Sequence, residues 1–213
     1  YLASLPWVKA IRNEKNLGFV QACNQGIEAA AGEYTVLLNN DTILTRGWLA
    51  RLVEGAESSG DIGMVGPTTN YAAGPQCIDV PYATVEAMHD YAADRYFRHA
   101  LTTIETERLI GFCLLIKRGV IEATGQLDER FGLGLFDDDD ISLRARLAGY
   151  RLVYMPGVFI HHFGGKTFES LGIDAASLLE SNWQQFRNKW QDHQVAGGEI
   201  RRLYRPADEH HSA

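Results

Sequence analysis

Segments with the pattern of strands alternate with segments with the pattern of helices along most of this chain. Strands are predicted at the apolar runs WVKAI (7–11), YTVLL (34–38), IGMVG (62–66), LIGFCLLI (109–116), RLVYM (151–155) and the start of VFIHHFGGKTF (158–168). Helices are predicted over residues 18–32, 48–58, 85–100, 119–124, 136–150 and 174–190. This alternation is typical of an α/β protein with a mainly parallel sheet, in which ligands bind at the carboxyl ends of the strands.

Length and composition predict a single domain over residues 1–196 and a flexible tail over 197–213. The net charge of −7 argues against nucleic acid as a main partner, because phosphate binding needs clustered Lys and Arg. The three cysteines lack metal-ligand spacing, which indicates reduced thiols of a cytoplasmic protein. No apolar run is long enough to span a membrane. Since the chain has no initiator Met, we expect a piece of something longer.

Two polar clusters follow predicted strands. Asn39 and Asp41 of LLNNDT point the same way in an extended segment and offer oxygen ligands suited to Mg²⁺ or Mn²⁺. The alternative is an Asx-turn that ends the strand. His161 and His162 follow a later strand, and one of them could ligate a metal, although a packed or solvated histidine is an equally ordinary interpretation.

The stretch FDDDDISLRARLAGY (136–150) places four aspartates at the start of a predicted helix. Asp140 precedes Arg144 by four residues, a helical ion-pair spacing, and acidic residues suit the positive end of the helix dipole. If Asp138 faces the cleft, its acidic neighbours raise its proton affinity, which suits a general base near neutral pH. The alternative is a solvated acidic cap.

The ordered motifs resemble those of a known family. NLGFVQACNQGIEAAAGEYTVLLNNDT is similar to the family-2 inverting glycosyltransferases, which carry N-x-G-F-x-x-x-N-x-G before a strand that closes on a D-x-D-like triplet. GPTTNYAAGPQ and LIGFCLLIKR resemble the middle of the rhamnosyltransferase-like branch. The FDDDDISLRARLAGY block, with HHFGG downstream, resembles the F-[ED]-D-x-D-L-x-x-R block and its His-x-Gly-Gly. The resemblance runs from about residue 11 to residue 168.

The resemblance implies a GT-A-like fold, a nucleotide-sugar donor (UDP-, dTDP- or GDP-sugar), Mg²⁺ or Mn²⁺, and a glycan or lipid-linked acceptor. It also implies a cytoplasmic location, with peripheral membrane association left open. Carried over by motif, Asp138 is the catalytic base, and Asp41 and His162 are the metal ligands. The implied contacts are, for the acceptor, Asp137, Gly111 and Asn70, and, for the donor, Asn16, Gly18, Asn24, Asn39, Asn40 and Asp41.

Two departures from the family pattern bear on function. Asn39 stands at the first D-x-D position, which predicts weakened metal binding. The family's opening strand, helix and second strand, which carry the pocket for the nucleotide base, have no counterpart before residue 7. A non-catalytic binding module derived from a truncated glycosyltransferase is therefore the main alternative. A nucleotidyltransferase is a third hypothesis, although no Gly-rich basic phosphate loop is visible.

Overall fold

The computed structural model describes residues 4–164 and 172–193 of the chain, which groups into two compact units, Tyr1–Lys166 and Thr167–Ala213. The strands described in the first unit are β1 (Tyr34–Leu38), β2 (Thr42–Ile43), β3 (Ile62–Thr68), β4 (Ile104–Thr106), β5 (Cys113–Lys117), β6 (Arg151–Phe159) and β7 (His161–His162). Its α-helices are α1 (Phe19–Ala29), α2 (Trp48–Glu57), α3 (Val85–His99), α4 (Arg118–Thr124) and α5 (Asp137–Leu147), with short 3-10 turns η2 (Gly74–Gln76) and η3 (Glu129–Phe131). The second unit contains α7 (Ala175–Trp190).

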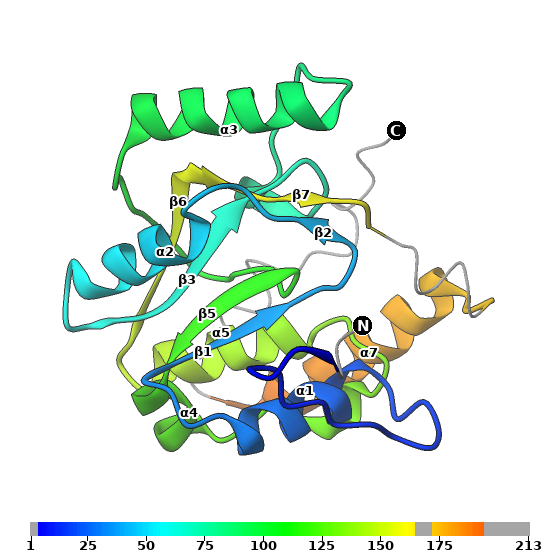
Figure 1. Cartoon of the computed structure of the whole chain (residues 1–213). Coiled ribbons are helices and arrows are strands. Elements are labelled where there is room, and N and C mark those ends of the chain that lie inside the picture. The colour runs from blue at the N-terminus through cyan, green and yellow to red at the C-terminus, as the bar shows by residue number, and fades with distance from the viewer. Residues whose placement is uncertain (1–3, 165–171, 194–213) are drawn as a thin grey trace. The chain divides into compact units, whose positions relative to one another are not determined.

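A five-stranded sheet in the order β1-β5-β3-β6-β4 forms the centre of the first unit (Figure 1). The pair β3–β6 is parallel, whereas β1–β5, β3–β5 and β4–β6 are antiparallel. The α/β class is confirmed, but the prediction of a mainly parallel sheet is wrong, since β5 and β4 run against β1, β3 and β6. The carboxyl ends of β1, β3 and β6 and the start of β5 therefore share one edge of the sheet, where α/β proteins bind ligands.

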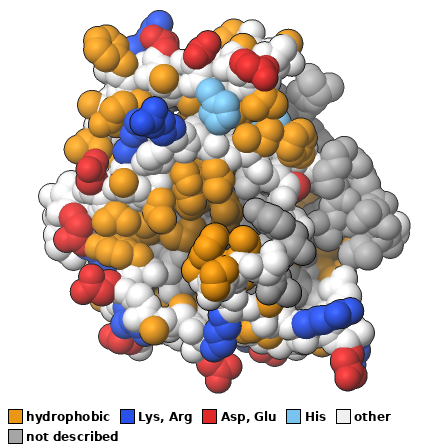
Figure 2. Space-filling model, viewed as in Figure 1, with side chains coloured by type: hydrophobic (Ala, Val, Ile, Leu, Met, Phe, Trp, Pro, Cys, Tyr) orange, Lys and Arg blue, Asp and Glu red, His pale blue; other side chains and the backbone are white. Residues whose placement is uncertain are grey.

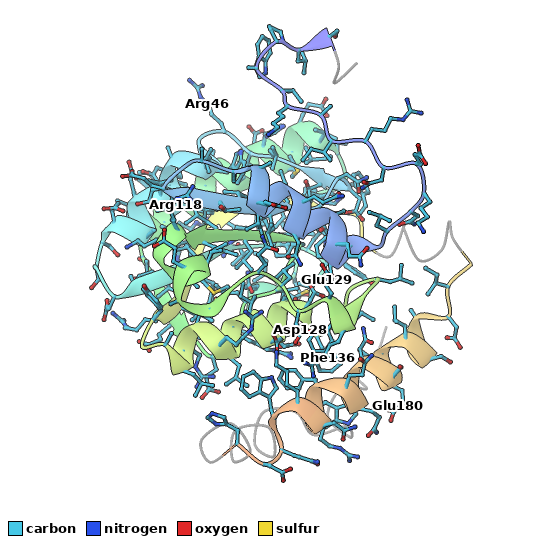
Figure 3. All side chains as sticks on the ribbon, turned by 90° about the horizontal axis from the view of Figure 1, so that it is seen from below. Arg46, Arg118, Asp128, Glu129, Phe136 and Glu180 are labelled. Carbon is cyan, nitrogen blue, oxygen red and sulfur yellow. The ribbon has the colours of Figure 1, made fainter. Side chains whose placement is uncertain are left out.

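Helices cover both faces of this sheet. In Figure 1, α2 and α3 lie above it and α1, α4 and α5 lie below it. The main core places Leu52 of α2 against buried side chains of the sheet such as Val65, Leu115 and Val153. Arg118, labelled in Figure 3, donates from Nε and Nη2 to the Gly32 carbonyl oxygen and so ties the turn after α1 to the end of β5.

The strand prediction fails at three places. Residues 7–11 form no strand, because they have no strand partner among the described residues, and Trp7 is 78% exposed. The continuous apolar run 34–38 is typical of a central strand, but it forms an edge strand that pairs, among the described strands, only with β5, and Leu38 is exposed. Figure 2 shows apolar side chains gathered on the face of the molecule that carries β1 and α2. In the run 109–116 the strand begins only at Cys113, because the amides before it donate to side chains instead.

Two further strands, β2 and β4, were not predicted, and the strands predicted at 151–155 and from 158 form the single strand β6. The helix boundaries agree closely with the prediction. The expected helices of the first unit appear as α1 to α5, and the last expected helix appears as α7. The predicted tail, 197–213, and the end of the Gly-rich loop, 165–168, lie outside the described residues. Among the helices described, none is both long and apolar enough to cross a lipid bilayer.

Candidate active site

The polar clusters predicted from sequence meet at the shared edge of the sheet. Asn39 follows β1, Asn70 and Tyr71 follow β3, and His162 follows β6. Gly111 lies just before β5 and contacts α5 through Asp138. The site therefore has two corners, an acidic corner at the start of α5 and a histidine corner around His162.

Asp138 is held by two backbone amides at the acidic corner. The Gly111 amide donates to Oδ2 at 2.8 Å, and the Asp139 amide donates to Oδ1 at 2.9 Å. Burial and, next, the negative charge of Asp139 raise the pKa of Asp138 to about 7, although the two amides and Arg108 act in the opposite direction. A carboxylate that binds and releases a proton near neutral pH has the property that a general base needs.

The other three aspartates have separate roles. Asp137 is 4% exposed, and burial together with the charge of Asp138 raises its pKa well above the usual value. Asp139 pairs with Arg108 at 3.3 Å, and Asp140 pairs with Arg144 at 2.8 Å across one helical turn. The alternative of a uniformly solvated acidic cap is therefore wrong: Asp137, Asp139 and Asp140 are buried.

A strained turn delivers the aspartates to the site. Gly134, Leu135 and Phe136 all have positive φ values (107°, 72° and 69°), and Phe136 is the residue that precedes the first turn of α5. Positive φ is unfavourable for residues with a large side chain, so the fold around this turn must offset the strain, as is common at functional sites. Figure 3 marks the approach to α5 with Asp128, Glu129 and Phe136.

His162 is surrounded by polar groups at the histidine corner. Its Nδ1 lies 2.9 Å from the Tyr71 carbonyl oxygen, and its Nε2 lies 3.3 Å from Asn39 Nδ2 and 3.2 Å from Asp41 Oδ1. A carbonyl oxygen only accepts hydrogen bonds, so Nδ1 carries a proton, and in neutral His162 the Nε2 lone pair faces the Asp41 carboxylate. Two acceptors so placed suit a shared cation, and the carbonyl contact at Nδ1 is the usual support of a metal-bound histidine.

Backbone contacts bring Asn39, Asp41 and His162 together. Thr42 of β2 pairs with His162 of β7, and the Phe163 amide donates to the Asp41 carbonyl oxygen at 3.0 Å. Among the described residues, no group of three His, Cys, Asp or Glu side chains is arranged to hold a metal ion. Asp41 and His162 therefore fit a divalent cation only as part of a ligand set that substrate phosphates and water complete, which is ordinary for Mg²⁺.

Phe112 links the two corners. It directly follows Gly111, the partner of Asp138, and its carbonyl oxygen accepts the Asn39 amide at 2.9 Å. Its ring stacks on the His162 imidazole, with 5.4 Å between centroids and 19° between planes. Phe112 was not singled out from sequence, because an aromatic residue in an apolar run predicts only a core position.

Three residues expected at the donor shape the start of α1. Asn16 accepts the Gly18 amide at 2.9 Å, and Gly18 has φ 87°. The Asn24 side chain exchanges hydrogen bonds of 2.9 and 3.0 Å with the backbone of Leu127 and is 6% exposed. Asn24 thus joins α1 to the segment before η3, which gives no support to a donor contact. Asn40, in contrast, is exposed.

Asn70 holds the backbone of His162 in place. Its Nδ2 donates to the His162 carbonyl oxygen at 3.0 Å, and its Oδ1 accepts the His162 amide at 2.9 Å. Each of these bonds leaves one N–H or one lone pair of the amide unaccounted for, so the acceptor contact of Asn70 stays a prediction. Sequence reasoning also missed Tyr71 and Arg108, whose roles depend on contacts between distant segments.

Comparisons with known proteins agree with this geometry. Residues 3–176 match the model of the "Glycosyltransferase like family 2". An uncharacterized protein of Mycobacterium tuberculosis is 32% identical over 160 residues, which cover 72% of this chain and 56% of that protein. The chain thus spans a little over half the length of that relative. An N-acetylglucosaminyl-diphospho-decaprenol L-rhamnosyltransferase of M. tuberculosis is 25% identical over 202 residues, 83% of this chain and 64% of that protein.

A solved structure shows the same fold. The mannosyltransferase PcManGT from Pyrobaculum calidifontis, in complex with GDP-Man and Mn²⁺, superposes with a TM-score of 0.54 at 20% identity, over 82% of this chain and 45% of that one. The expectation of a GT-A fold is confirmed by this likeness, and the family match covers most of the chain. The chain belongs to the family-2 glycosyltransferases.

Proposed function

We propose that this chain carries the catalytic centre of an inverting glycosyltransferase, which transfers a sugar from a nucleoside-diphosphate sugar to a hydroxyl group of a glycan or lipid-linked acceptor. The observation that carries the proposal is Asp138, a half-buried carboxylate that two amides orient and whose pKa is about 7. Membership of the glycosyltransferase family supports the class of reaction.

In the proposed reaction, Asp138 accepts a proton from the acceptor hydroxyl group. The hydroxyl oxygen attacks the anomeric carbon, the proton passes to the carboxylate, and the bond from that carbon to the diphosphate oxygen breaks with its electron pair. One displacement of this kind inverts the anomeric centre. General-base assistance contributes roughly 10² to 10⁴ in rate. Asp137, Gly111 and Asn70 remain the proposed acceptor contacts.

Asp41 and His162 are the residues that would hold Mg²⁺ or Mn²⁺, next to Asn39. A bound divalent cation stabilises the negative charge that develops on the leaving diphosphate. The facing acceptors at Asp41 and His162 support this assignment, as does the Mn²⁺ in the structure of PcManGT. The proposed donor contacts remain Asn16, Gly18, Asn39, Asn40 and Asp41.

The nature of the acceptor is proposed from the rhamnosyltransferase relative, whose name gives a diphospho-decaprenol-linked sugar as its substrate. A lipid-linked glycan is the corresponding acceptor class for this chain. The proposed location is the cytoplasmic side, at the inner face of the membrane that carries such an acceptor.

Calorimetric titration of the full chain with UDP-, dTDP- and GDP-sugars, with and without Mn²⁺, tests the donor site. We expect one nucleotide class to bind, with affinity that falls at least tenfold when Mn²⁺ is omitted or in Asp41→Ala. Asp90→Ala, at an exposed position of α3, is the control and should bind like the wild type. If the folded protein binds none of these donors, the enzymatic proposal gives way to a non-catalytic binding module.

A further inference from the structure

The amides of residues 109–111, shortly before β5, all donate to side chains from other parts of the chain. Leu109 donates to Ser142 Oγ at 3.2 Å, and Gly111 donates to Asp138 Oδ2 at 2.8 Å. Between them, Ile110 donates to Gln76 Oε1 at 2.8 Å. Asp138 and Ser142 are four residues apart on α5 and so lie on one face of the helix. Segment 109–111 is thus held on one side by α5 and on the other by Gln76.

Gln76 is a buried bridge with both ends of its amide in use. The side chain is 1% exposed, and its Nε2 donates to the Pro67 carbonyl oxygen at 2.8 Å while its Oε1 accepts from Ile110. A Cβ atom at Gly66 would lie 2.5 Å from Gln76 Nε2 and 3.0 Å from a methyl carbon of Leu109. The glycine therefore provides the space that lets Gln76 connect β3 to the segment before β5.

The loop that carries Gln76 also supports the histidine corner. Its base is closed where Thr69 donates to the Gln76 carbonyl oxygen and accepts from Ile78, each at 2.9 Å. At its other end, Asn70 pairs with the His162 backbone and the Tyr71 carbonyl oxygen accepts from His162 Nδ1. One loop, 69–77, thus reaches both corners of the site.

We propose that Gln76 is a positioning residue for the base: by holding Ile110, it keeps the adjacent Gly111 amide on Asp138. This inference rests on the proposed function, in which Asp138 accepts the proton of the acceptor. The effect of Gln76 on Asp138 passes through the two consecutive amides of Ile110 and Gly111 and not through a direct contact.

Loss of the bridge has a specific consequence. Without the Gln76 acceptor, the Ile110 amide must find another partner, and segment 109–111 moves relative to α5. A misplacement of about 1 Å at a reacting group can lower the rate by about 10². A side-chain substitution at Gln76 leaves the backbone hydrogen bonds that close the loop at Thr69, so donor binding at the histidine corner is expected to remain within about twofold of the wild type.

The ionisation of Asp138 provides a readout that a purely structural role would not change. The Gly111 amide lowers the pKa of Asp138, so loss of this contact should raise it. The other charged groups that act on Asp138 are Asp137 and Asp139 on its own helix and Arg108 from the segment before β5. None of these is removed by a substitution at Gln76.

The test compares Gln76→Met with Gln25→Met in the full chain. Both substitutions remove two side-chain hydrogen bonds, since Gln25 exchanges bonds of 2.9 and 3.0 Å with Asn13, outside the site. The Asp138 carboxyl carbon is followed by ¹³C NMR from pH 5 to 9, with Asp138→Asn to assign its signal. Release of nucleoside diphosphate, with the donor identified by titration, gives kcat and KM.

For Gln76→Met we expect the Asp138 titration midpoint to move to higher pH and kcat to fall about 10- to 100-fold with donor KM unchanged. Gln25→Met should match the wild type. Should Gln76→Met fail to fold, Gln76→Asn, which is too short to span Pro67 and Ile110 together, should shift both readouts in the same directions. If Asp138→Asn is inactive but the folded Gln76 variant has the wild-type titration midpoint and the wild-type kcat, the inference about Gln76 is overturned. Full activity of Asp138→Asn would instead overturn the proposed function.

Discussion

Asp138→Asn should gain stability relative to the wild type as the pH rises from 5 to 8. The pKa of Asp138 is raised from 3.8 to about 7 in the folded protein. A group whose folded pKa is raised contributes stability below its unfolded pKa and loses that contribution as the pH rises through the folded pKa. The window for Asp138 therefore runs from about pH 4 to pH 7.

The size of the effect follows from linkage. Between pH 5 and pH 6 the folded state holds about one proton more than the unfolded state, and at pH 7 about half a proton more. Wild-type stability therefore falls by about 1.4 kcal/mol per pH unit at first and by about half that near pH 7. Asp138→Asn lacks this dependence. Its free energy of unfolding should therefore rise, relative to that of the wild type, by on the order of 2 to 3 kcal/mol between pH 5 and pH 8. At pH 5 the variant should be the less stable protein. Asparagine has an NH₂ group in place of one of the two oxygens that accept the Gly111 and Asp139 amides, so one amide loses its acceptor, which costs about 1 to 3 kcal/mol.

Chemical denaturation of the wild type and Asp138→Asn at pH 5, 6, 7 and 8 measures this directly. Asp90→Asn, at an exposed position on α3, is the control and should show no such pH-dependent difference. Parallel stability curves for Asp138→Asn and the wild type over this range would refute the reasoning, because they would mean that Asp138 titrates alike in the folded and unfolded states.

Two further substitutions test the groups around the site. Arg108→Met should move the acid limb of kcat/KM to higher pH, because Arg108 lowers the pKa of Asp138. A partly exposed charge contributes roughly 0.2 to 1 kcal/mol, so activity at pH 7 should fall by up to about threefold while activity at pH 9 is unchanged, and a shift to lower pH would contradict this. Gly18→Ala should destabilise the protein by about 1 to 3 kcal/mol in thermal unfolding, because φ is 87° and the new Cβ would lie 2.8 Å from the Gly132 carbonyl oxygen. Gly26→Ala, in the open interior of α1, should instead stabilise it by about 0.5 to 1 kcal/mol, and equal effects of the two substitutions would contradict the account.

The sequence was most informative where a local pattern determines a local structure. Helical periodicity located α1 to α5 closely, and strand endings placed Asn39, Asp41 and His162 at what proved to be one edge of the sheet. Strand direction and edge position could not be predicted in this way, because an apolar run such as YTVLL carries no information about its neighbours.

The supports of the site were also beyond prediction from sequence. Asn24 and Asn70 fell on motif positions that suggested ligand contacts, but each side chain bonds the backbone of a segment distant in sequence. Gln76 and Ser142 lie within the quoted motifs but were given no role there, and Arg108 was not singled out, since the roles of all three depend on the approach of loops and helices that only the fold brings together. The aspartate run was different, because four crowded like charges indicate on their own that something must stabilise them or use them.

The central claim is that Asp138 removes the proton of the acceptor. The most direct test is the rate of sugar transfer by Asp138→Asn, with donor affinity measured on the same preparation. The account predicts that kcat falls by roughly 10² or more while donor affinity stays within about twofold of the wild type. Transfer at the wild-type rate by this variant would contradict it.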